Sequence, residues 1–147
     1  MKKSIRMFVL TLSVCTLMMV FSVGAQNKLV TRPLKMMAQS QQVIDLTNGN
    51  LVAHADGVSS HLGKVTMDCT GSIYDPIIDG TITAANGDLL YWEGDLNSPL
   101  VIITHGTGRF ENAQGEFVME TISSSQKYDG QTLILSFVWT ASGTITY

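Results

Sequence analysis

Hydrophobic and polar positions alternate along the middle of the chain, most regularly from His61 to Thr70. One side of an extended chain would carry His61, Gly63, Val65, Met67 and Cys69, and the other Leu62, Lys64, Thr66, Asp68 and Thr70. Alternation at every second residue is typical of a β-strand with one buried face and one hydrated face. We therefore expect an antiparallel strand over residues 61–70.

Further short strands are expected from residue 51 to the end of the sequence, separated by turn residues. Asn86-Gly87 is a favoured hairpin turn, and Asp129-Gly130 indicates another. No window has the periodicity of an amphipathic helix. This pattern predicts an all-β barrel or sandwich. The other expected strands cover residues 51–55, 77–84, 88–93, 100–105, 116–122, 132–140 and, after a break at Ser142-Gly143, 143–147.

Residues 26–49 are the least patterned part of the sequence. Lys28–Thr31 has the composition of a short strand, and Pro33 would start or flank another. Thr47–Asn50 is a clear turn signal. We therefore expect the regular β-domain over residues 50–147, with residues 26–49 contributing its first strand or strands.

The N-terminus has the features of a secretory signal peptide. Lys2, Lys3 and Arg6 precede an uncharged run over residues 7–23, and small residues end that run. We expect cleavage after Ala25, a secreted or periplasmic protein, and no membrane span in the mature chain. An uncleaved anchor is the weaker alternative because the apolar run is short for a bilayer. Lipidation at Cys15 is disfavoured because Val14 precedes it, where a small residue is needed.

Removal of residues 1–25 changes the charge and cysteine content. It takes away three of the nine basic residues and none of the twelve acidic ones, so the net charge falls from −3 to −6. An acidic chain lacks the positive face that nucleic-acid binding requires, and nucleic acid is excluded as a partner. Cys69 is then the only cysteine, without an internal disulfide partner. Its alternation with Val65 and Met67 predicts a buried thiol.

A glycine-rich segment over residues 106–117 carries the most specific motif, of the form G-T-G-x-F-x-x-A-x-G-x-F. The glycines permit a backbone turn that larger residues would resist. Phe110 and Ala113 are expected to cap one end of a core, and Gly115 to start the returning strand. The motif residues are Gly106, Gly108, Phe110, Ala113 and Gly115.

This segment resembles the turn shared by dirigent proteins and allene oxide cyclases, and the surrounding order resembles small secreted bacterial proteins of that group. Three further segments match in order: Ser60–Gly63, Thr83–Asp88 and Gly143–Tyr147. The resemblance covers about residues 58–147. It implies a closed antiparallel barrel of about eight strands and, by analogy with the plant relatives, a homo-oligomer such as a trimer. It brings no catalytic side chains, since the matching residues are turn and strand-start residues.

The histidines are the principal candidates for polar chemistry. His61 and His105 fall on the apolar faces of their expected strands, whereas His54 shares a face with Asp56. Core histidines bonded to the backbone, or polar groups in an apolar ligand cavity, are both consistent with this placement. No spacing brings three ligands together, so no metal site and no cofactor are predicted. Ser123–Ser125 is interpreted as a polar loop rather than a nucleophile.

Large apolar side chains are expected either to fill the barrel or to line a cavity within it. Outward Ile102, Ile134 and Val138 indicate a patch that another subunit or a loop would cover. The candidate ligand-binding residues are His61, Met67, Trp92, His105, Met119, Phe137 and Trp139.

These observations favour an exported β-barrel that binds an apolar small molecule or a partner and does not catalyse a reaction. One alternative is an isomerase or cyclase of the allene-oxide-cyclase or dirigent type, in which positioning supplies much of the catalysis. Another is a structural envelope protein that assembles through its outer faces. A large interior cavity with His61 or His105 pointing into it would favour binding or catalysis.

Overall fold

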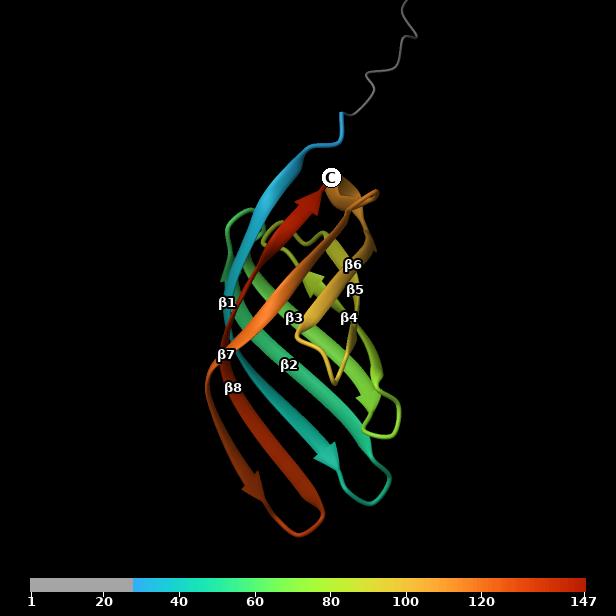
Figure 1. Ribbon diagram of the computed structural model, residues 1–147, viewed down its shortest axis with the longest axis vertical. Coiled ribbons are helices and arrows are strands. Elements are labelled where there is room, and N and C mark those ends of the chain that lie inside the picture. Colours follow the sequence, from blue (N-terminus) through green and yellow to red (C-terminus); the bar gives the residue numbers. More distant parts are fainter. Residues whose placement is uncertain (1–27) are drawn as a thin grey trace, which may run out of the picture.

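Eight antiparallel strands follow one another around a closed barrel, and β8 pairs with β1 to complete the circle (Figure 1). The structure is a computed structural model that describes residues 28–147, so the predicted signal peptide lies outside the described residues. The predicted fold class, an all-β antiparallel barrel, is thereby confirmed. The strands are β1 (Thr31–Asp45), β2 (Asn50–Ser59), β3 (Gly63–Ser72), β4 (Ile77–Thr83), β5 (Leu89–Asp95), β6 (Leu100–Gly106), β7 (Gln114–Tyr128) and β8 (Thr132–Thr146).

The apolar face predicted for residues 61–70 is the face that the barrel encloses from Val65 to Cys69, whereas His61 and Leu62 lie in the turn before β3. Val65, Met67 and Cys69 are buried on β3, as Ile82 is on β4. Three strands are longer than their sequence patterns suggested. β2 continues to Ser59, β7 to Tyr128, and β8 runs through Ser142-Gly143 without interruption. Among residues 28–147, no helix is long and apolar enough to cross a membrane.

The poorly patterned N-terminal segment forms one long strand, β1, rather than a short strand over Lys28–Thr31 followed by another. Its first inward positions are apolar, and Leu34 and Met36 are buried. Outward Met37 is exposed, whereas inward-facing Ser40 lines a cavity. Because apolar and polar residues are exchanged between the two faces in this way, the alternation in the sequence is obscured.

Ser123–Ser125 lies within β7, so the prediction of a loop was wrong. The pairing of β7 with β8 continues from these serines to Tyr128, beyond a register shift at Ile122. All residues from Glu120 to Tyr128 are exposed. The long partner strand β8 therefore keeps this segment extended, although its own sequence has no buried face.

A second bulge changes the direction of His105. Tyr91 pairs with His105 and Trp92 with Ile103, so Thr104 is an extra residue on β6. An extra residue reverses the alternation of the side chains beyond it. His105 is consequently exposed, although Val101 and Ile103 before the bulge are buried.

The glycine-rich motif closes one end of the barrel, as predicted. Its short 3-10 helix η2 (Gly108–Phe110) places Phe110 in the core, and Phe110 and Ala113 are both fully buried. A Cβ atom at Gly106 would lie 2.5 Å from the carbonyl oxygen of Leu89 and 2.6 Å from that of Phe110. Only glycine allows this close approach of the turn to β5.

Candidate functional site

The interior of the barrel is not completely filled. A cavity of about 180 Å³ lies among inward-facing residues of all eight strands, away from the end that Phe110 closes. The loop between β5 and β6 contributes Asp95, Leu96 and Ser98 to its lining. Leu96 and Ser98 are exposed, so the cavity reaches the surface at this loop.

The cavity wall is predominantly apolar. Alternation along the strands directs most of these side chains inward, whereas Leu100 borders the cavity at the start of β6. Small residues on several strands leave the space between the large ones. The apolar wall residues are Ala53, Ala55, Met67, Ile78, Trp92, Leu100, Val101, Met119 and Trp139. An apolar cavity of roughly 150 Å³ is enough to hold a molecule of the size of benzene. This cavity therefore suits a small apolar molecule.

A few polar groups interrupt the apolar wall. Ser40 and Gln42 enter from β1, and the indole N–H of Trp139 donates a hydrogen bond of 3.1 Å to Ser40 Oγ. The indole N–H of Trp92 is buried and has no hydrogen-bond partner among the described residues. The cavity thus combines an apolar surface with few orienting polar groups, as ligand sites commonly do.

Cys69 also lines the cavity and is buried, as the sequence predicted. Burial raises the pKa of its thiol to about 11, because the thiolate loses hydration inside the barrel. At neutral pH the group is therefore a protonated thiol and a weak nucleophile. Among the described residues, the neighbours of the Cys69 thiol are mainly apolar, and no cation beside the thiol lowers its pKa.

Four of the predicted ligand-binding residues meet at this cavity: Met67, Trp92, Met119 and Trp139. Phe137 faces the same side of β8 but lies outside the cavity. It borders a separate hollow of about 430 Å³ whose other lining residues are mostly polar, including Gln39, Gln41 and Ser123–Ser125. Phe137 is therefore not part of the apolar cavity.

Neither His61 nor His105 lines the interior cavity. His61 lies in the turn between β2 and β3, where its carbonyl oxygen accepts a 2.8 Å hydrogen bond from Arg109 Nη2. Leu62, not His61, enters the core from this turn. The bulge at Thr104 turns His105 outward, and its ring stacks on Tyr91 with centroids 4.3 Å apart.

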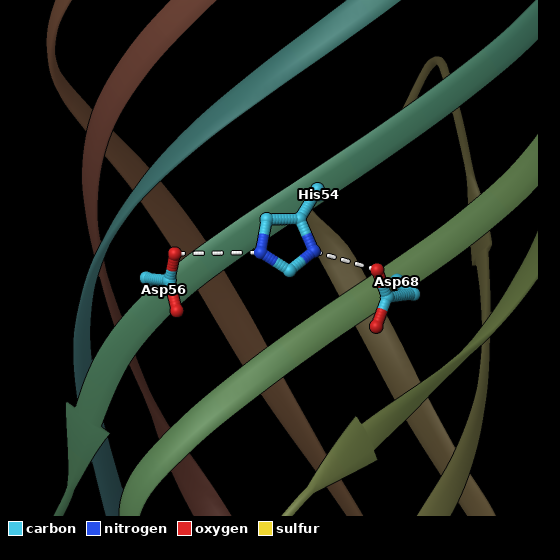
Figure 2. Close-up of polar contacts among 3 residues, drawn as sticks. All are labelled: His54, Asp56 and Asp68. Atoms are coloured by element: carbon cyan, nitrogen blue, oxygen red, sulfur yellow. Dashed lines mark hydrogen bonds and ion pairs between the residues drawn. The ribbon is translucent and has the colours of Figure 1, made fainter.

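His54 is held between two carboxylates on the outer face of the barrel (Figure 2). Its Nδ1 lies 2.6 Å from Asp68 Oδ1, and its Nε2 lies 3.3 Å from Asp56 Oδ2. The hydrogen bond with Asp68 is the main reason that the pKa of His54 is raised above its ordinary value. The carboxylates lie at opposite edges of the ring, so they cannot share one metal ion with it.

Within residues 28–147, no group of three His, Cys, Asp or Glu side chains is placed to hold a metal ion.

Sequence reasoning missed Ser40 and Gly94 as cavity residues. Ser40 lies in the irregular part of β1, and Gly94 has no side chain to indicate a face. Periodicity carries no signal for either residue.

No family model and no curated protein matches the sequence. Two solved structures of pterocarpan synthase dirigent proteins are similar to this chain. The first is 15% identical with a TM-score of 0.45, and the match covers 81% of this chain and 92% of that one. The second is 13% identical with a TM-score of 0.40 and covers 78% and 95%. The closed eight-stranded barrel of this chain is established by its own strand pairing.

Proposed function

We propose that this protein is an exported barrel that binds a small, largely apolar molecule in its interior cavity. The observation that carries the proposal is the apolar cavity of about 180 Å³ that reaches the surface beside Leu96. Buried apolar surface supplies most of the binding energy in such sites. The volume is below the roughly 300–1,000 Å³ of pockets that hold drug-sized ligands, which favours a compact ligand.

The cavity supports binding better than catalysis by acid–base or nucleophilic groups. His61 and His105 do not line the cavity, and the imidazole of His54, a residue that borders it, is held between Asp56 and Asp68 on the outer face. The thiol of Cys69 is protonated at neutral pH. Binding and release of an unchanged molecule is therefore the proposed activity. If the protein were an isomerase that acts by positioning alone, its substrate would occupy the same cavity but would be released as an altered molecule.

The direct test is to find what the cavity holds. The mature protein is purified from its own host and examined by native mass spectrometry, and any released compound is identified. In parallel, toluene is titrated into the ligand-free protein and followed by calorimetry and by the melting temperature. We expect saturable binding and an increase in melting temperature that follows the toluene concentration. Recovery of the bound compound after incubation distinguishes binding from conversion.

A matched pair of variants locates the binding. Ala53 is half-buried and lines the cavity, whereas its neighbour Val52 is 55% exposed on the outer face. Ala53→Leu adds carbon atoms inside the cavity, and Val52→Leu adds one outside. We expect Ala53→Leu to abolish toluene binding and Val52→Leu to leave it unchanged. Binding that survives Ala53→Leu in a folded protein, or no binding by the unaltered protein, would refute the proposal.

Export is the second part of the proposal and has its own measurement. The positive N-terminus, the apolar run and the small residues before Gln26 support it. Intact mass and N-terminal sequencing of the protein from its host should give a chain that begins at Gln26. A chain that retains residues 1–25 would contradict cleavage without affecting the binding proposal.

A further inference from the structure

β7 has a neighbouring strand on both sides only in its first part. β6 pairs with β7 no further than Val118, and the last contact is a 2.9 Å hydrogen bond from Met119 N–H to Pro99 O. From Glu120 to Tyr128, β8 is the only strand beside β7 among the described residues, and Figure 1 shows this part of β7 at the margin of the molecule. All its residues are exposed. We call residues 120–128 the free edge.

The backbone of the free edge offers hydrogen-bonding groups that β8 does not use. The N–H of Asp129 donates a 3.2 Å hydrogen bond to Thr132 O, so Asp129 directs its backbone groups toward β8. In an antiparallel ladder the bonded residues alternate along each strand. Ser124, Gln126 and Tyr128 therefore direct their N–H and C=O groups away from β8. A row of such groups is a template for another strand.

Little in the sequence of the free edge blocks such pairing. Exposed edges are usually protected by proline, by several charges or by a bulge. The free edge contains no proline, and Glu120 and Lys127 are its only charged residues. Its bulge lies near the start, at Ile122, so residues 123–128 keep a regular register with β8. The edge is therefore open to a strand that places an opposite charge against each of its two charges.

The two charges are placed symmetrically about Ser124. Their positions follow from the ladder with β8, in which the partners of Glu120, Ser124 and Lys127 are Thr140, Phe137 and Ile134. Because the bulge adds one residue to β7, Glu120 and Lys127 each lie three ladder positions from Ser124. Side chains alternate along the ladder, so both charges lie on the same face of the sheet. An antiparallel pair of copies about a two-fold axis at Ser124 therefore sets each Glu120 opposite the partner's Lys127.

We infer that the free edge binds the same edge of a second copy of this chain, in an antiparallel pair centred on Ser124. Such an interface is its own complement, as two-fold symmetry requires. It provides hydrogen-bond partners for the backbone of Ser124 and Gln126, and it pairs both charges of the edge with opposite charges. A parallel pair in register would instead place like charges side by side. The inference does not depend on the proposed ligand, because none of residues 120–128 lines the interior cavity.

The test measures the Kd of the dimer by sedimentation equilibrium, at protein concentrations from about 1 μM to 1 mM, the range of weak complexes. We expect a monomer–dimer equilibrium in the unaltered protein. Glu120→Lys and Lys127→Glu each replace two unlike charge pairs across the interface with two like pairs. Each variant should therefore raise the Kd by about tenfold, although the two change the net charge in opposite directions.

The double variant Glu120→Lys with Lys127→Glu is the matched control, because it exchanges the two charges and keeps the net charge. Both unlike pairs are restored, so its Kd should return to within about threefold of the unaltered protein's value. A monomer over the whole concentration range would overturn the inference. An oligomer whose stability does not respond to the single variants, or a double variant no tighter than the singles, would also overturn it.

A second pair of variants tests the backbone pairing. Ser124→Pro removes the N–H at the centre of the interface, whereas Ser124→Val keeps it, and neither removes a bond to β8. We expect Ser124→Pro to remain a monomer throughout the range and Ser124→Val to form the dimer. Circular dichroism and unchanged toluene affinity show that each variant is folded. Equal dimerisation of the two folded variants would overturn the inference.

Amide hydrogen exchange followed by NMR requires no variant. The N–H groups of Ser124 and Gln126 should exchange quickly in dilute protein and more slowly as the concentration rises and the dimer forms. The N–H groups of Ser125 and Lys127, which face β8, should exchange at a rate that does not change with concentration. Exchange at Ser124 and Gln126 that is equally independent of concentration would overturn the inference.

Discussion

Gly94→Ala is expected to stabilise the protein and to weaken ligand binding at the same time. Gly94 lines the cavity on β5. Its Cβ would lie 3.5 Å from Trp92 Cζ3 and 3.8 Å from both Leu100 O and Val101 Cγ2, which are ordinary van der Waals contacts. Gly94 is also absent from the glycines with positive φ, so its backbone accepts alanine. The new methyl group therefore occupies cavity space without displacing its neighbours.

Two effects contribute to the gain in stability. Burial of one methyl group contributes about 0.8 kcal/mol. Restriction of the unfolded chain by alanine adds about 0.4–1 kcal/mol. Together they raise the free energy of unfolding by about 1–2 kcal/mol, which corresponds to an increase in Tm of roughly 4–8 °C for a domain of this size. The same methyl group reduces the space for a ligand, so the Kd for toluene should increase.

Gly80→Ala is the matched comparison on the neighbouring strand. A Cβ there would lie 2.2 Å from the carbonyl oxygen of Asp68 and 2.6 Å from Trp92 Cζ2. Overpacking of this kind lowers the free energy of unfolding by about 1–3 kcal/mol. We expect a loss toward the upper end, because the contact with the Asp68 carbonyl oxygen involves rigid backbone. Urea denaturation and toluene calorimetry on both variants provide the test. Destabilisation by Gly94→Ala would refute the argument that a methyl group fits beside Trp92. Unchanged toluene affinity in that variant would show that the space beside Trp92 is not the binding cavity.

Three further predictions concern other parts of the barrel. Because the pKa of Cys69 is raised to about 11, the rate of its alkylation by iodoacetamide should keep rising with pH above 9. In the unfolded protein the rate should level off near pH 9. A plateau near pH 9 in the native protein would contradict the burial of the thiol. The raised pKa of His54 contributes stability that is fully present below about pH 6.5 and is lost as the pH rises through the folded-state value. Since His54 is 53% exposed, the contribution should be below about 1 kcal/mol. An NMR titration should show Asp68→Asn lowering the His54 pKa, and an unchanged value would refute the assigned cause. Phe110→Ala should destabilise the closed end by about 3–5 kcal/mol in urea denaturation, because Phe110 is fully buried, and a cost below 1 kcal/mol would show that this end can collapse.

The inward and outward faces of the regular strands could be predicted from the sequence. Val65, Met67 and Cys69 alternate with polar residues, and the barrel buries them as expected. The glycine-rich turn could also be predicted, because closely spaced glycines indicate a tight turn and Phe110 is a large apolar residue within it. These features depend on neighbours in sequence, which is where periodicity carries its information.

Part of the candidate site could also be predicted from the alternation of residues along single strands. Met67, Trp92, Met119 and Trp139 were predicted to line or fill the interior from the faces of their strands, and all four line the cavity. The volume that remains between them depends on how residues from different strands pack across the barrel. The same holds for the bond that satisfies Trp139 but not Trp92, since Ser40 and Trp139 are far apart in sequence.

The sequence alone therefore determined an all-β chain, its regular strand faces and its closing turn. Only the tertiary structure decided that His105 points outward, because the bulge at Thr104 arises from the register between β5 and β6. It also decided that Ser123–Ser125 is strand, because β8 supplies the hydrogen-bonding partner. Alternation is a local property of the chain, whereas register, bulges and the space inside the barrel are set between strands.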